Sequence, residues 1–254
     1  MMMHNTLLHI ARRHLLQVLA RSLVLAAALN VMACSGGGRR EMQRLLAEAD
    51  SMNRNYVTFT TDTILLRAVR LADRHGTNTD RVRARYLLGC AYRDMGEAPQ
   101  ALDCYHQAID QADTTRADCD FILLAKIHGQ AGDLFAQQGL SRNAKDEYRH
   151  GEQFAWKAND TLTAILAYGQ QAGCYYDMNM YDSVLFVAEQ TRRLLMLHGD
   201  TLMANTFLAP TINILLSQGK YHEAMPLLYD YEYNSSVNFR IARRAYTSAT
   251  GGSM

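Results

Sequence analysis

Residues 81–112 read RVRARYLLGCAYRDMGEAPQALDCYHQAIDQA, and this stretch decides the fold class. Each half carries apolar and small residues at helical spacing, with Gly96 between the halves. The two stripes are Leu88, Gly89 and Tyr92 in the first half, and Ala101, Tyr105 and Ala108 in the second. This spacing predicts two helices that contact each other through small residues and are joined by a tight turn at Gly96.

The same pattern returns along the chain at intervals of about 40 residues. The predicted turns carry Gly96, Gly139, Asn179 and Gly219. Helix starts repeat at the same interval, because Asp120, Asp160 and Asp200 stand where each pair should begin and can accept hydrogen bonds from free N–H groups. Thr77 has this role in the first clear repeat, and Gly76 and Gly199 are expected to end helices in the left-handed conformation.

This pattern resembles the tetratricopeptide repeat (TPR), in which helical hairpins stack side by side. The resemblance implies an all-α, right-handed TPR solenoid of about four clear repeats plus one degenerate N-terminal repeat. The repeat period of about 40 residues exceeds the family's usual 34, and the second helix and its exit are the expected place of the extra length. Pro210 and Pro226 fall inside the two helices of the last repeat, where proline predicts a kink. We expect the degenerate pair at 41–76, the four repeats at 77–232, and a terminal helix and disordered tail at 233–254.

The N-terminal segment has the features of a secretory signal. Basic residues precede an apolar run at 23–29, and the tetrad Val31-Met32-Ala33-Cys34 follows. The tetrad resembles a bacterial lipobox, which implies a signal peptide at 1–33, a lipidated Cys34 carrying acyl chains such as palmitate, and a flexible tether at 34–40. By this resemblance the chain is a Gram-negative TPR lipoprotein, anchored in the outer membrane and facing the periplasm. The alternative is an ordinary cleaved signal or an uncleaved anchor in which Cys34 has no role.

Composition and motifs argue against several other classes. The 254 residues carry a formal net charge of +1, which gives no reason to expect nucleic acid as a partner. We find no phosphate-binding loop, nucleophile elbow or zinc-protease motif, and we expect no enzyme activity, small-molecule cofactor or metal. The other four cysteines are expected to be buried apolar residues. Structural or exposed roles are expected for the histidines outside the signal: His75, His106, His128, His150, His198 and His222.

In the TPR family the first helix of each repeat lines a concave groove, and the resemblance transfers these positions to the present chain. The predicted partner-binding residues are Arg83, Tyr86, Arg93, Asp94, Lys126, Asp133, Gln137, Tyr176, Asp177 and Asn213. Arginine binds carboxylates bidentately, so Arg83, Arg93 and Lys126 around Tyr86 could hold an acidic peptide. Glycines further along, among them Gly129, Gly169 and Gly173, would let a peptide backbone approach closely.

These observations favour a lipid-anchored, non-catalytic scaffold that binds a protein or peptide in the cell envelope. Two alternatives stay open at this point. One is a glycan-binding lipoprotein similar to the SusD-like starch-utilisation family, although Trp156 is the only tryptophan that could form a sugar platform. The other is the TPR sensor portion of a longer regulatory protein.

Overall fold

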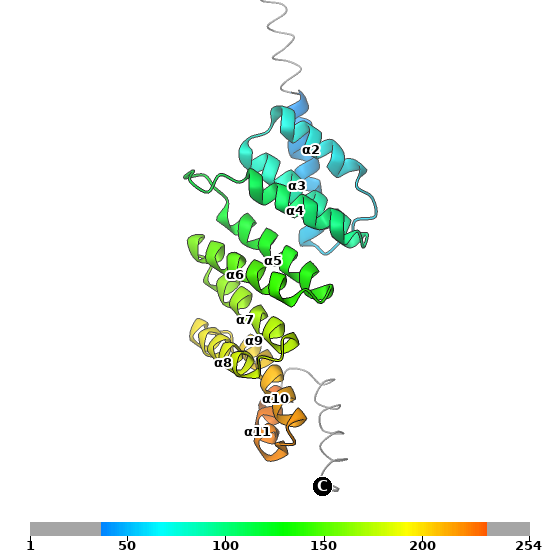
Figure 1. Cartoon of the computed structure of the whole chain (residues 1–254). Coiled ribbons are helices and arrows are strands. Elements are labelled where there is room, and N and C mark those ends of the chain that lie inside the picture. Colours follow the sequence, from blue (N-terminus) through cyan, green and yellow to red (C-terminus); the bar gives the residue numbers. More distant parts are fainter. Residues whose placement is uncertain (1–36, 233–254) are drawn as a thin grey trace, which may run out of the picture. The chain divides into compact units, whose positions relative to one another are not determined.

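The computed structural model describes residues 37–232, and every regular element in that range is a helix (Figure 1). The predicted signal peptide, Cys34 and the predicted terminal helix and tail lie outside the described residues. The described chain divides into two compact units, one ending at Gly96 and the other beginning at Glu97. Each unit is treated by itself below.

The first unit contains a helix over 37–54, α2 (Thr63–His75) and α3 (Asn78–Asp94). The first two are the degenerate helix pair predicted at 41–76. Residues 37–40, however, are helical and not part of a tether. Packing explains this difference, because a Cβ atom at Gly38 would lie 2.7 Å from the His75 ring. Gly38 therefore lets the start of the first helix pack closely against His75 of α2, at a position that the sequence analysis assigned to a flexible tether.

The start of α3 is stabilised as predicted. The Thr77 hydroxyl accepts from the Asp80 N–H at 3.2 Å, and the Asp80 carboxylate accepts from the Thr77 N–H at 2.8 Å. This reciprocal pair is a capping box. The left-handed conformation expected at Gly76 is wrong, because Gly76 has φ −85° and ψ 160°. Glycine is needed there for space, since a Cβ would lie 2.6 Å from the Ala72 carbonyl oxygen.

The second unit is a succession of helices, each packed on its neighbour in the chain, with α9 and α10 as two segments of one interrupted helix (Figure 1). Asp120, Asp160 and Asp200 cap α5, α7 and α9 as predicted, accepting from the N–H three residues later at 2.9, 3.1 and 3.0 Å. The eight helices described in this unit are α4 (Ala98–Gln111), α5 (Phe121–Gln137), α6 (Ser141–Lys157), α7 (Thr161–Asp177), α8 (Tyr181–His198), α9 (Thr201–Thr206), α10 (Leu208–Ser217) and α11 (Tyr221–Glu232).

The turns within the repeats share one backbone conformation. Gly96, Gly139, Asn179 and Gly219 all have positive φ, between 58° and 80°. Gly199 has φ 91° and ends α8 as predicted. The residues that predicted the repeat period are therefore those that the backbone requires at its turns.

The extra length of the repeats is not confined to the second helices, because the first helices α3, α5 and α7 have 17 residues each. The second helices α6 and α8 have 17 and 18 residues. In the first clear repeat, α4 has only 14 residues, and the non-helical segment 112–120 supplies the added length at its exit.

The last repeat accommodates Pro210 by a break in its first helix. The helix is interrupted at Phe207, so that Pro210 is the third residue of α10, where its missing N–H costs no helical hydrogen bond. The break also directs the Phe207 ring onto α7, because a Cβ at Gly169 would lie 2.4 Å from that ring. Phe207 packs there against a core of Ile165, Leu195 and Ala204.

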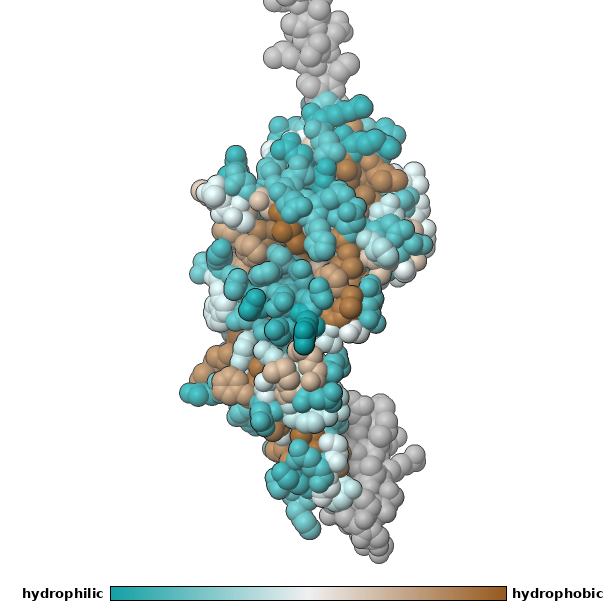
Figure 2. All heavy atoms as spheres, viewed as in Figure 1, coloured by the Kyte–Doolittle hydropathy of each residue, from teal (hydrophilic) through white to brown (hydrophobic). Residues whose placement is uncertain are grey.

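The surface is mainly hydrophilic on the face shown in Figure 2, with smaller hydrophobic areas among the hydrophilic ones. Among residues 37–232, none of the helices combines the length and apolar character needed to cross a bilayer.

Candidate functional site

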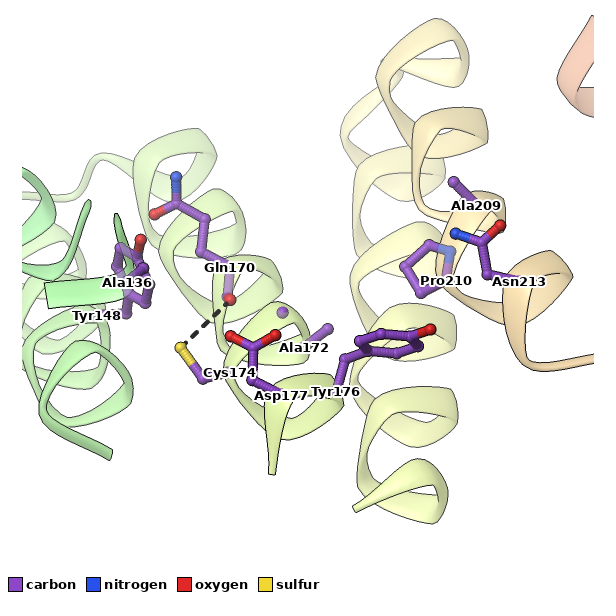
Figure 3. A pocket seen from close by; sticks show the side chains of 11 residues that line it. Ala136, Tyr148, Gln170, Ala172, Cys174, Tyr176, Asp177, Ala209, Pro210 and Asn213 are labelled. Atoms are coloured by element: carbon purple, nitrogen blue, oxygen red, sulfur yellow. Dashed lines mark hydrogen bonds between the residues drawn. The ribbon is translucent and has the colours of Figure 1, made fainter. Parts of the chain in front are cut away.

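A pocket of about 380 Å³ opens in the second unit (Figure 3). First helices of successive repeats form most of its wall, since α5, α7 and α10 each contribute residues. The lining residues are Ala136 of α5, Tyr148 of α6, Gln170, Ala172, Gly173, Cys174, Tyr176 and Asp177 of α7, and Ala209, Pro210 and Asn213 of α10.

Tyr148 reaches the pocket from a second helix because α5 has no side chain in its way. A Cβ at Gly132 would lie 2.6 Å from the Tyr148 ring, so the ring lies directly against the backbone of α5. The Tyr148 hydroxyl donates to Asp133 Oδ1 at 2.8 Å. Asp133 therefore acts on the pocket indirectly, by holding Tyr148 in place.

The polar groups of the pocket can form hydrogen bonds with both the N–H and the C=O groups of a peptide backbone. Ser141 donates to Asp177 Oδ2 at 3.0 Å and orients that exposed carboxylate, which can accept from a further N–H group. The exposed side-chain amides of Gln170 and Asn213 can each donate and accept. In Figure 3 the Tyr176 ring extends from α7 toward the helix that carries Pro210 and Asn213. The arrangement suits binding of an extended backbone together with a small apolar group.

Cys174 is the one thiol among the lining residues. Burial, with the Asp177 charge nearby, raises the pKa of the Cys174 thiol to about 11. The thiolate is the reactive form, so very little of it is present at neutral pH. Cys174 behaves here as a small apolar wall residue, as do the buried Cys90 and Cys104 elsewhere, while Cys119 is half-buried.

Three of the predicted groove residues of the second unit lie together in this pocket: Tyr176, Asp177 and Asn213. Asp133 lies behind Tyr148, whereas Lys126 and Gln137 are exposed on α5 and are not lining residues. Gly169 does not face a groove, because the Phe207 ring covers it.

The predicted groove residues of the first unit already have partners within that unit. Arg83 forms an ion pair with Asp50, and Arg93 with Asp94 at 2.6 Å. Asp94 also accepts from the Phe59 N–H at 3.0 Å. Tyr86 was expected on the groove surface, but it is only 6% exposed and its hydroxyl accepts from Asn53 at 3.2 Å. An acidic peptide would have to displace these carboxylates before it could use the arginines.

Sequence reasoning missed Tyr148 and Pro210 as pocket residues. Tyr148 belongs to a second helix, and its route to the pocket depends on Gly132 in the preceding helix. A glycine in the middle of one helix, with a large aromatic residue at a facing position of the next, is the signal that could have indicated it. The cluster of His128, Glu147 and His150 was missed as well. Glu147 and His150 have the E-x-x-H spacing of known carboxylate–histidine metal ligands, and this spacing is the signal that could have indicated it.

The tyrosine in the pocket wall makes the stability of the fold sensitive to alkaline pH. Burial raises the pKa of Tyr148 above its ordinary value of 10.0, and the hydrogen bond to Asp133 raises it further. Above pH 10 the unfolded chain therefore releases this proton while the folded chain retains it, so that the free energy of unfolding falls. We expect Tyr148→Phe to lose about 1.5–3 kcal/mol at pH 8, the value of a hydrogen bond to a charged group.

The same variant should show a weaker decrease of stability between pH 8 and pH 11 than the wild type, as measured by urea unfolding. Some decrease will remain because the pKa values of Tyr86 and Tyr168 are raised too. Tyr229→Phe, at a half-exposed position of α11, is the matched control and should change neither quantity. An identical pH profile for Tyr148→Phe and wild type would show that the folded structure does not raise the pKa of Tyr148.

Comparisons with known proteins identify the fold. No family model and no curated protein matches the sequence. The structure is similar to that of BtubC from P. vanneervenii, with TM-score 0.59 and 14% identity, covering 87% of this chain and 92% of that one. It is also similar to a putative kinesin light chain of Podosopora anserina with TPR-like repeats (TM-score 0.58, 12% identity, 83% and 97% coverage). A third similar structure is a Rap protein complexed with competence and sporulation factor (TM-score 0.54, 14% identity, 84% and 63% coverage). At these identities the similarity shows the fold alone, which is an all-α TPR-like solenoid.

Proposed function

We propose that this TPR-like chain is a non-catalytic scaffold that binds a protein or peptide partner and is held in the cell envelope by a lipid on Cys34. The pocket between α5, α7 and α10 carries the first part of the proposal. Its volume of about 380 Å³ is near the lower end of the range of about 300–1,000 Å³ for ligand pockets. It has room for one or two side chains of a peptide and little more.

The chemistry of the wall supports a peptide as the occupant. Alanine, glycine and proline form much of it, so a backbone can approach closely, while Asn213, Gln170 and Asp177 offer hydrogen bonds to main-chain groups. The Rap protein complexed with competence and sporulation factor is an example of a similar fold that holds a partner. Binding in this pocket does not require the predicted groove residues that lie outside it, which are Arg83, Tyr86, Arg93, Asp94, Lys126 and Gln137.

Filling the pocket tests the proposal directly. Gly173 lines the pocket, and a Cβ added there would meet open space, with nothing within 4 Å. Gly173→Leu should therefore fold normally, and its side chain should fill part of the pocket. A partner is first identified by crosslinking in cells to the wild-type chain, and its affinity is then measured with purified proteins. We expect Gly173→Leu to weaken binding at least about tenfold, or about 1.4 kcal/mol.

The matched control is Gly129→Leu, a glycine of α5 that also has open space at its Cβ but does not line the pocket. It should bind the partner like the wild type. Equal affinity of Gly173→Leu and wild type would exclude the pocket as the binding site.

The lipid anchor is tested separately, since a chain without it can still bind a partner. The lipobox-like tetrad Val31-Met32-Ala33-Cys34 supports acylation at Cys34. Multiple acyl chains would make the attachment stable, because each buried methylene contributes about 0.8 kcal/mol. We expect metabolic labelling with an alkynyl palmitate analogue and recovery in the outer-membrane fraction, both lost in Cys34→Ala. Unchanged labelling of Cys34→Ala would contradict this assignment.

A further inference from the structure

A second cluster of chemically capable side chains lies away from the pocket, between α5 and α6. His128 of α5 faces Glu147 and His150 of α6, and one ligand atom from each lies within 4.8 Å of the others. Glu147 and His150 are three residues apart in one helix, a spacing that places both side chains on the same side. His128 lies in the preceding helix, 19 residues before Glu147, so the spacing of residues within one helix did not connect it to the other two.

The central member of the cluster is a buried imidazole. His128 is 5% exposed, and its Nδ1 lies 2.7 Å from Glu147 Oε2. Its Nε2 is buried and has no hydrogen-bond partner among the described residues. Phe154 stacks on the ring at a centroid distance of 5.3 Å, which fixes the ring plane. Buried polar atoms without a partner are uncommon, and an ion or water is a usual explanation.

A third histidine adjoins the cluster from α4. His106 Nε2 lies 4.0 Å from Glu147 Oε1, so the Glu147 carboxylate has imidazoles near both of its oxygens. His150 and His106 are solvent-exposed, whereas His128 is buried. An ion can therefore reach the cluster from the exposed side, and the buried side provides a fixed ligand.

We propose that His128, Glu147 and His150 form a binding site for a divalent transition-metal ion of the zinc class, with His106 as the fourth ligand. Imidazole nitrogen together with one carboxylate oxygen suits zinc and its neighbours in the first transition row, and disfavours calcium and magnesium, which prefer oxygen ligands. Zinc bonds of about 2.0–2.1 Å place tetrahedral ligands about 3.3 Å apart. Binding would lengthen the present 2.7 Å contact between His128 Nδ1 and Glu147 Oε2, and rotation of the exposed His150 and His106 side chains would bring their nitrogens to this separation.

Such an ion links three consecutive helices. Its ligands come from α4, α5 and α6, so binding favours the state in which all three are packed together. The expected consequence is a rise in the thermal midpoint with zinc concentration, because a ligand that binds only the folded state stabilises it by mass action.

The test uses the full chain without an affinity tag and with ZnCl₂ as the probe. Calorimetric titration should show one saturable ion per chain, and the thermal midpoint should rise in parallel. His150→Gln at an exposed position and Glu147→Gln at a half-buried position spare the buried His128. Each should weaken binding at least about tenfold, because even outer partners of metal ligands contribute 10–100-fold. Substitution with Co²⁺ should give a tetrahedral absorption spectrum that both variants change.

His222→Gln is the matched control, since it removes an exposed histidine of α11 far along the chain from the cluster. It should bind zinc like the wild type. Equal zinc affinity in His150→Gln, Glu147→Gln and wild type would place the ion elsewhere, for example on the N-terminal histidines His4, His9 and His14, and would overturn the proposal. Absence of saturable binding by the folded wild-type chain would also overturn it.

Discussion

Leu195→Ala is expected to lower the free energy of unfolding of the second unit by about 2–5 kcal/mol, the range for removal of a buried leucine side chain. Leu195 is 0% exposed and lies in the core formed by Ile165, Ala204 and the Phe207 ring. Truncation to alanine leaves a cavity among side chains of α7, α8 and α9 and the Phe207 ring, which are packed too closely to collapse and fill it. Urea unfolding followed by circular dichroism measures the change.

The control lies two residues further along the same helix. Leu197 is 76% exposed, and Leu197→Ala should change the free energy of unfolding by no more than about 0.5 kcal/mol. Both substitutions remove the same atoms from α8, so the difference between them isolates burial from helix propensity. Equal effects of the two substitutions would mean that α8 presents a different face to the core.

Gly169→Ala is the second change with a large expected effect. A methyl group at this position would lie 2.4 Å from Phe207 Cε1 and 2.7 Å from Thr191 Cγ2. Thr191 is fully buried and its hydroxyl donates to the Val187 carbonyl at 2.7 Å, so it has little freedom to move. We expect a loss of about 1–3 kcal/mol in the free energy of unfolding, the usual cost of forcing an extra carbon into a packed core.

Gly173→Ala, one helical turn later, should have the opposite sign. Its Cβ meets open space, and replacement of glycine by alanine inside a helix adds about 0.5–1 kcal/mol. Thermal and urea unfolding of the two variants can be compared directly. A stabilising Gly169→Ala would show that the Phe207 ring does not pack on α7, and that the break between α9 and α10 has another origin.

The sequence alone predicted those parts of the fold that depend on local chemistry. Thr77, Asp120, Asp160 and Asp200 revealed the helix starts, because a cap needs only a side-chain oxygen next to a free N–H. The turn residues at 96, 139, 179 and 219 revealed the hairpins, because few residues adopt positive φ. These signals act over a few residues and can be read without knowing the tertiary structure.

Features that depend on distant partners could not be predicted in the same way. The arginine at position 83 looked available for a ligand, but its ion pair with Asp50 spans more than 30 residues. The His128 cluster combines residues from two helices whose facing positions are set only by packing. Gly169 was assigned to a groove, although it is needed because the Phe207 ring lies close to its backbone.

The Tyr148 side chain limits how freely this binding site can be exchanged between proteins. Repeat proteins are often treated as modular, with hairpins that can be deleted or recombined one at a time. Here the preceding hairpin supplies two wall residues, Ala136 and Tyr148, and the Tyr148 ring passes beside Gly132 to reach its place. A graft limited to the last two hairpins would lack that wall, so the smallest transferable cassette starts at the cap of α5.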